Sequence, residues 1–185
     1  MDISRFTTKA QEALQSAQSL AMGMNHQVME IEHLFAALLR QEEGLIPRLF
    51  EVLEKDLPLI RRRSEELLQA LPRVTGAGAP EKINISPRLH QLLEDAPRHA
   101  RQLKDDYVSV EHFILSLLDK FGDSKVVKIL TEQGVDKDSF LNALSRIRGH
   151  QRITTPDPEG TFEVLEKYGR DLVQLAREGK LDPVI

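Results

Sequence analysis

Two Glu-His pairs are the residues of this sequence best suited to chemistry. Glu32 and His33 lie in the segment MEIEHLFAALL, and Glu111 and His112 lie in the similar segment VSVEHFILSLL. Carboxylate and imidazole groups bind a metal ion or exchange protons when they converge on one point. Adjacent residues on a helix point about 100° apart, so neither pair can hold one ion by itself. We therefore interpret both histidines as helix-start residues that satisfy main-chain groups, and we expect no metal site.

A second set of residues could form an acid–base pair. His90 and Glu94 have the i, i+4 spacing that places two side chains on one helix face, and His99 follows nearby. A solvated helix face is the simpler interpretation, and a hydrolase that uses these three residues is the competing hypothesis. The sequence contains no GxSxG nucleophile elbow, no GxxxxGK[ST] or GxGxxG phosphate loop, and no cysteine. We expect the chain not to be an enzyme and to bind no cofactor of its own.

Composition and charge narrow the class of protein further. Hydrophobic residues make up 41% of the chain and aromatic residues only 5%, which favours helices over a β-sandwich. The net charge is −4, and the basic run Arg61–Arg63 is followed at once by Glu65 and Glu66, so we expect no nucleic-acid partner. No apolar run reaches the ~18 residues of a membrane span, and the amino terminus lacks signal-peptide features. We expect a cytoplasmic location and no membrane contact.

The two Glu-His segments belong to a longer internal duplication. His33 and His112 are separated by 112 − 33 = 79 positions. The same offset aligns the preceding residues without a gap: Phe6 with Ile85, Thr7 with Ser86, Leu14 with Leu93, Ala17 with Ala96 and Ala21 with Ala100. Repetition on this scale indicates two copies of one structural unit.

Each copy predicts about four helices. Apolar stripes and caps place the first helix after Thr7 or Thr8 in one copy and after Ser86-Pro87 in the other. Ser109 should cap a helix that begins at Val110, and shorter helices should follow over residues 44–55, 57–71, 125–133 and 137–147. A single unit of ~70 residues is marginal alone, so the two should pack face to face and leave a groove that could hold a peptide.

The expected architecture is therefore all-α, with two pseudo-symmetric four-helix repeats. Repeat one spans residues 1–71 and repeat two spans 85–148, and together they form one domain over 1–148. Residues 149–160, rich in Gly, Pro and polar residues, are predicted to be a flexible linker. Residues 161–185 carry an apolar stripe typical of one further helix that would lead into another domain.

The quoted segments resemble a known family. RFTTKAQEALQSAQSLAMGMNHQVMEIEHLFAALL, its echo at 85–118 and the closing YGRDLVQLAREGKLDPVI are similar to the amino-terminal region of Clp-family AAA+ unfoldases, most closely their disaggregase branch. The resemblance implies a domain that docks unfolded or aggregated polypeptide for a homohexameric threading machine, whose ATP and Mg²⁺ sites lie in ATPase domains beyond this chain. The alternative is a domain that docks an adaptor or co-chaperone for a Clp protease ATPase.

The resemblance also implies which residues handle the substrate. Thr7, Asp105 and Glu111 match family positions around a shallow groove between the repeats, and His112 is expected to contact the peptide in the same groove. Some related proteins have leucines along that groove where this chain has Asp95, His99 and His112. The resemblance therefore implies a more polar groove and weak binding, micromolar or weaker, which avidity across a hexamer would offset.

Overall fold

The computed structural model describes residues 2–76 and 82–158. Its described part is mostly helical, with two strands of two residues each, which confirms the predicted all-α class. The elements are η1 (Ile3–Arg5), α1 (Thr8–Gly23), β1 (Val28–Met29), α2 (Ile31–Arg40), α3 (Leu45–Val52), α4 (Leu57–Gln69), β2 (Asn84–Ile85), α5 (Pro87–Gln102), α6 (Val110–Lys120), α7 (Lys125–Glu132) and α8 (Lys137–Arg148). None of these helices has both the length and the apolar content needed to cross a bilayer.

The long helix of each repeat begins at the same capping chemistry. The Thr7 hydroxyl oxygen accepts a hydrogen bond of 3.2 Å from the Ala10 N–H at the start of α1. The Ser86 hydroxyl oxygen accepts one of 3.1 Å from the Leu89 N–H at the start of α5. These bonds satisfy N–H groups that have no partner within the helix, so two positions 79 residues apart define equivalent helix starts.

Short strands link the two repeats reciprocally, which the sequence pattern did not predict. Met29 pairs in parallel with Ile85, and Phe6 forms an isolated parallel bridge with Val108. Adding 79 to Met29 and subtracting 79 from Ile85 converts the first pair into the second. Each repeat therefore extends its amino-terminal strand against the other repeat, which is the arrangement expected of a pseudo-twofold axis.

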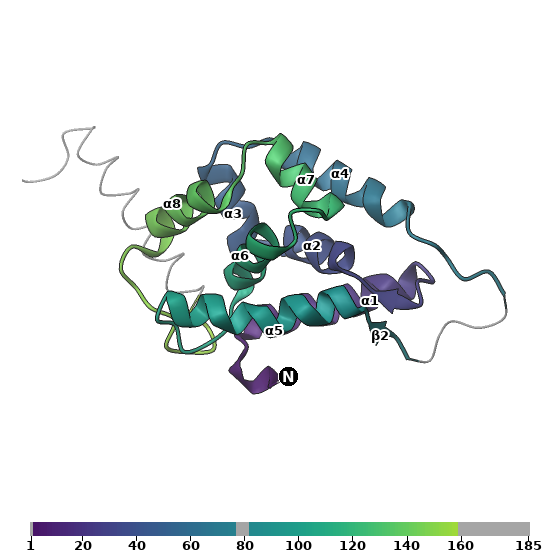
Figure 1. The fold of residues 1–185 in the computed structure, drawn as a ribbon, viewed down its shortest axis with the longest axis horizontal. Helices are drawn as coiled ribbons and strands as arrows, with labels where there is room; N and C mark the ends of the chain where they lie inside the picture. The colour runs from purple at the N-terminus through teal and green to yellow at the C-terminus, as the bar shows by residue number, and fades with distance from the viewer. Residues whose placement is uncertain (1, 77–81, 159–185) are drawn as a thin grey trace, which may run out of the picture.

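Helix packing between the repeats follows the same exchange. Helices α2, α3 and α4 of repeat one correspond to α6, α7 and α8 of repeat two. Helix α3 packs against α8 and α6, and the corresponding helix α7 packs against α4 and α2. Figure 1 shows these neighbours: α4 lies beside α7, α3 lies beside α8, and α2 and α6 occupy the middle of the molecule. The two predicted four-helix repeats are thus confirmed as equivalent halves of one packed unit.

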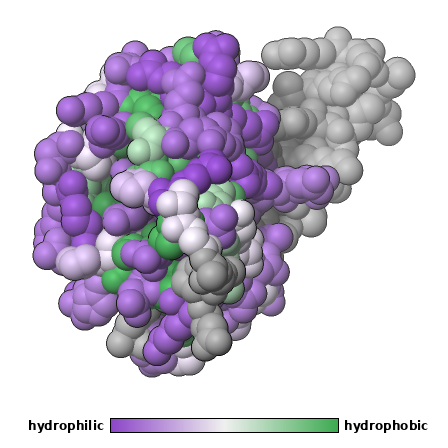
Figure 2. Space-filling model, turned by 90° about the vertical axis from the view of Figure 1, so that its right-hand side faces the viewer, coloured by the Kyte–Doolittle hydropathy of each residue, from purple (hydrophilic) through white to green (hydrophobic). Residues whose placement is uncertain are grey.

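One hydrophobic core runs through both halves. Most buried apolar side chains of the described residues form a single cluster to which each α-helix from α1 to α8 contributes. Phe6 of repeat one and Phe113 of repeat two meet edge to face, with ring centroids 5.8 Å apart. The face of the molecule seen in Figure 2 is mostly hydrophilic, with apolar side chains visible in recesses between polar ones. Because the core is shared, neither repeat buries its apolar face without the other.

Residues after repeat two return to the domain surface. Ile153 is fully buried, its C=O accepts a hydrogen bond of 2.8 Å from the Asp106 N–H, and the Thr8 N–H donates to the Pro156 C=O at 2.8 Å. We call residues 150–156 the return segment. The flexible-linker role assigned to residues 149–160 stays a prediction, and the helix expected over 161–185 lies outside the described residues.

Candidate functional site

A groove lies where the two repeats exchange strands. Its volume is about 670 Å³. Residues from η1, α5 and the α5–α6 loop line it: Asp2, Arg5, Phe6, Leu93, Glu94, Pro97, Ala100, Arg101, Asp105, Asp106 and Val108. We call this the inter-repeat groove. Its volume falls within the ~300–1,000 Å³ typical of ligand sites.

The groove combines an apolar floor with a charged rim. Phe6 and Val108 are almost fully buried and are joined by the strand bridge, so the floor is built from the junction itself. Exposed charges of both signs, including Glu94 and Arg101, stand at the rim. Such a surface can take up apolar side chains of an extended peptide while its rim contacts the polar main chain.

Asp105 joins the groove to the interior of repeat two. Its carboxylate accepts a hydrogen bond of 2.8 Å from Nε2 of His112 and two from the guanidinium of Arg148, one of them 3.0 Å long. The Ile153 N–H of the return segment donates to its Oδ1 at 2.9 Å. Four donors therefore converge on one buried carboxylate, drawn from α6, α8 and the return segment.

The protonation state of this cluster follows from its partners. Burial by itself raises the pKa of Asp105, but the hydrogen bonds from His112, Arg148 and the Ile153 N–H outweigh burial and hold that pKa below its usual value. Asp105 is therefore a carboxylate at neutral pH. The Nδ1 of His112 accepts the Ser109 N–H at 2.8 Å, so a neutral His112 carries its proton on Nε2 and donates it to Asp105.

Repeat one contains a different pair at the equivalent positions. His33 Nδ1 accepts the Glu30 N–H at 2.8 Å, and His33 Nε2 lies 2.7 Å from Nδ1 of His26. Burial, together with the neighbouring His26, lowers the pKa of His33 to about 4, and burial also lowers the pKa of His26. The prediction that both helix-start histidines satisfy main-chain groups is confirmed, and each is engaged within its own repeat.

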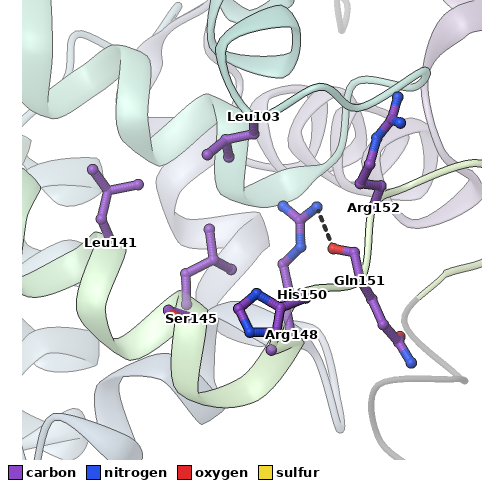
Figure 3. Close-up of a pocket in the computed structure, with 9 residues that line it drawn as sticks. Leu103, Leu141, Ser145, Arg148, His150, Gln151 and Arg152 are labelled. Carbon is purple, nitrogen blue, oxygen red and sulfur yellow. Dashed lines mark hydrogen bonds between the residues drawn. The ribbon is translucent and has the colours of Figure 1, made fainter.

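Figure 3 shows how the return segment closes over Arg148. The Arg148 guanidinium donates to the Gln151 C=O at 3.1 Å, the bond drawn as a dashed line, while Leu103 and Leu141 line the same pocket. The pocket volume is about 230 Å³. Arg148 is itself buried, so it ties the end of α8 both to Asp105 and to the segment that follows.

The family model of the Clp repeat (R) N-terminal domain matches residues 5–133, a range that includes both helix-start histidines and Asp105. This chain belongs to the Clp repeat N-terminal domain family. The family model describes an amino-terminal domain, in line with the helical repeats seen here.

Curated relatives of this Clp repeat domain are ClpB chaperones. Chaperone protein ClpB of Bacillus cereus is 44% identical over 186 residues, and the match covers 100% of this chain and 21% of that protein. ClpB of Nitratidesulfovibrio vulgaris is 46% identical over 186 residues, covering 100% of this chain and 22% of that protein. The chain thus spans about a fifth of the length of the curated relatives it matches. The predicted resemblance to a Clp-family chaperone is confirmed.

Solved structures share the fold. The Hsp104 N-terminal domain from Candida albicans superimposes with a TM-score of 0.71 at 24% identity, covering 83% of this chain and 98% of that one. The N-terminal domain of the ClpV1 ATPase from an E. coli type VI secretion system gives a TM-score of 0.68 at 18% identity, covering 80% and 88%. Their agreement supports the helical-repeat architecture of the Clp repeat domain.

All four predicted site residues are buried. Asp105 lines the groove, although its carboxylate is inaccessible to solvent, whereas Thr7, Glu111 and His112 do not line it. Neither Glu111 oxygen has a hydrogen-bond partner within the described structure, and burial raises its pKa. The Arg148 Nη1 lies 4.0 Å from Oε2 of Glu111. Their influence on substrate handling stays a prediction, and any such influence would act through the packing beneath the groove.

Two expectations about polar residues on α5 and α6 are corrected. Asp95, His99 and His112 were expected at the groove, but all three are buried and none lines it. His99 was also expected on a solvated face with His90 and Glu94. His90 and Glu94 do form an exposed pair at 3.4 Å, but His99 contacts Asp95 at 3.3 Å instead. Packing against α6 decides this, because Ser116 and Asp119 lie across from that part of α5.

Asp95, His99 and Asp119 place three potential metal ligands within 4.8 Å of one another. Their charge is already matched by side chains. The Arg98 guanidinium bonds both carboxylates and lies 3.2 Å from His99 Nε2, and Lys120 Nζ lies 2.9 Å from Asp95. A guanidinium nitrogen therefore contacts all three groups that would hold an ion. We interpret the cluster as an ion-pair network between α5 and α6.

Sequence reasoning missed Arg148 and the return segment. Arg148 lies in the last turn of α8, where a basic residue is favoured by the helix dipole alone, so its type carries no sign of a buried partner. Its partner Asp105 is 43 positions away in the sequence. In the sequence, Arg148 only follows the apolar stripe of α8, and this position does not identify its partner.

Proposed function

We propose that this Clp repeat N-terminal domain docks unfolded or aggregated polypeptide for an ATP-dependent disaggregase. The inter-repeat groove carries the proposal, because it has an apolar floor, a charged rim and a volume suited to a few side chains. Similarity to ClpB chaperones supports the same role. In this proposal the ATPase domains of the longer protein, with their ATP and Mg²⁺, perform the threading, and the assembly is a homohexamer in the cytoplasm.

Weak binding suits this role. A client held tightly at the entrance could not be passed on, so release must be fast. The mixed rim charges offer no strong electrostatic anchor, and the apolar floor is small. Several domains in one assembly would raise the effective concentration and give useful avidity without a tight single site.

The experiment is a binding titration followed by blockade of the groove. Addition of an unfolded client protein to the ¹⁵N-labelled chain should shift amide signals around Phe6, Asp105 and Val108.

The blockade uses a label at the groove rim. Because the chain has no cysteine, Glu94→Cys can be labelled there with a bulky maleimide. The label should abolish the shifts. Arg62→Cys, on the exposed face of α4, is the matched control and should leave them unchanged. Shifts confined to the Arg61–Arg63 face would contradict the proposal.

Adaptor docking is the second candidate. The N-domain of ClpV has been solved in complex with a VipB peptide, and it shares this fold with a TM-score of 0.63 at 16% identity. A relative of the same fold therefore binds a defined peptide. Saturable binding of one folded partner, with no shifts from any unfolded client, would favour this candidate over client docking.

A further inference from the structure

The His26–His33 pair ends in an unused hydrogen-bond donor. The backbone N–H of Glu30 donates to His33 Nδ1, so a neutral His33 must carry its proton on Nε2. That proton points to His26 Nδ1, 2.7 Å away, which must then accept. A neutral His26 consequently carries its own proton on Nε2. The tautomers of both rings are set by one main-chain group.

Within the part of the chain that the structure describes, this outer N–H of His26 has no acceptor. His26 is only 2% exposed, and its Nε2 has no hydrogen-bond partner among the described residues. Buried polar atoms are normally paired, so an unpaired donor here marks a place where an acceptor is missing.

Repeat two shows what chemistry the missing acceptor has. The positions 79 residues after His26 and His33 are Asp105 and His112, and there the helix-start histidine donates directly to a carboxylate. In repeat one a second imidazole stands where repeat two has that carboxylate. In repeat one the last donor is therefore Nε2 of His26 and not Nε2 of His33, and this donor has no carboxylate to bond among the described residues.

A cavity adjoins the His26 side chain. Its volume is about 260 Å³, and it is lined by His26, Gln27, Val28, Glu30, His33 and the segment Leu71–Val74. The volume is below the ~300 Å³ lower bound of drug-sized sites, so it suits one side chain better than a length of peptide. The Val74 N–H donates to the Asn25 C=O at 2.9 Å, which holds the covering segment in place.

Arg73 sets the sign of the ligand's charge. Its side chain belongs to the cavity wall, and its positive charge acts on His26. One guanidinium nitrogen bonds the Gln69 side chain, and the fork of Arg carries further N–H donors. Glu30 is the opposing charge in the wall. For a ligand that accepts from both His26 Nε2 and Arg73, the Arg73 charge therefore favours an anionic oxygen over a neutral carbonyl oxygen.

We propose that this cavity, which we call the His26 site, binds the carboxylate of an Asp or Glu side chain of a polypeptide. His26 Nε2–H and the Arg73 guanidinium donate to the two carboxylate oxygens. Binding displaces the cover of Leu71–Val74 far enough for the carboxylate to reach the buried nitrogen. The site lies within repeat one, so it stands or falls separately from docking in the inter-repeat groove.

The test uses two short peptides that differ in one group. The probes are acetyl-Gly-Glu-Gly-amide and acetyl-Gly-Gln-Gly-amide, titrated into the ¹⁵N-labelled chain while the histidine ring nitrogens are observed. The unliganded spectrum should show His26 protonated on Nε2. The Glu peptide should shift the His26 and Arg73 side-chain signals, and the Gln peptide should bind about tenfold more weakly because a charge-assisted hydrogen bond is lost.

His26→Asp is the decisive variant. It copies the pair of repeat two, supplies His33 with an internal carboxylate and removes the donor, so the fold should be kept while Glu-peptide binding is lost. Arg73→Gln should weaken binding of the Glu peptide about tenfold. The control His90→Asn changes an exposed histidine on α5 and should leave binding unchanged.

Three results would overturn the proposal: equal shifts with both peptides, shifts that survive in folded His26→Asp, or a His26 protonated on Nδ1. Sodium acetate alone should move the same signals more weakly, and acetate shifts elsewhere only would also count against it.

Discussion

His112 donates from Nε2 to Oδ2 of Asp105 across 2.8 Å, in the interior of the domain and directly beneath the inter-repeat groove. That one hydrogen bond joins the start of α6 to the loop that leaves α5. Arg148 and the Ile153 N–H bring α8 and the return segment to the same carboxylate. Asp105 therefore both lines the inter-repeat groove and holds the return segment against the domain.

Asp105→Asn should lower the free energy of unfolding by about 3 kcal/mol at pH 7, because it removes the buried carboxylate that accepts two hydrogen bonds from the Arg148 guanidinium. Urea denaturation measures the change. The folded-state pKa of Asp105 lies below the unfolded value, so its contribution is present above the unfolded pKa and is lost as pH falls through the folded pKa. The gap between wild type and variant should therefore narrow in acid. Asp106→Asn, an exposed neighbour, is the control and should change stability little.

The histidine pair of repeat one should make the domain sensitive to mild acid. The pKa of His33 falls from 6.5 unfolded to about 4 folded, so the unfolded chain binds a proton in a range where the folded chain does not. This stability is fully present above pH 6.5 and declines as pH falls toward 4, by on the order of 3 kcal/mol in total. Denaturation midpoints measured between pH 7 and pH 4 test it.

His26→Asp should reverse that trend for this pair. A carboxylate beside His33 favours the imidazolium, so the folded pKa of His33 would rise above the unfolded value. The pair would then contribute most between about pH 4 and pH 6.5, where the introduced carboxylate is ionised and His33 is protonated, and this contribution would be lost as pH rises through the folded pKa of His33. If the variant and the wild type lost stability in parallel over the acid range, the His26–His33 pair would not be the source of the acid sensitivity.

Lys104 has a left-handed backbone conformation that is strained for lysine, and repeat one has an asparagine at the equivalent position. Lys104 has φ of 59° and Asn25, 79 residues earlier, has φ of 57°. Asparagine tolerates this left-handed conformation and lysine does not. Lys104→Asn should raise the free energy of unfolding by about 0.5–1 kcal/mol, and Asn25→Lys should lower it by a similar amount. Thermal denaturation of the two variants checks the pair, and changes of the same sign in both would contradict the explanation.

Glu111→Gln should stabilise the domain at pH 7 and above. The Glu111 carboxyl is fully buried without a hydrogen-bond partner in the described structure, and its pKa is raised by burial. Ionisation therefore costs stability as pH rises, and the neutral amide avoids that cost, by about 1–3 kcal/mol. Chemical denaturation at pH 5 and pH 8 should show the advantage of the variant growing with pH. An advantage that is constant with pH would mean that Glu111 is already ionised in the folded state at pH 5, so that burial does not raise its pKa.

Much of the fold was predictable because its signals are local. The helix starts at Thr8, Pro87 and Val110 follow from caps and apolar periodicity within about four residues, and the offset of 79 positions then required a second copy of the same unit. The histidine bonds to Glu30 and Ser109 are also local, spanning three positions.

What the sequence could not show depends on groups far apart along the chain. The Phe6–Val108 bridge, the meeting of Asp105 with Arg148 and the burial of His99 against α6 each join segments separated by many residues. A two-residue strand carries no periodic signal, and an aspartate or arginine reads the same whether it faces water or a buried partner. Only packing of the two halves brings these groups together, and the exclusion of water there turns ordinary polar residues into a specific network.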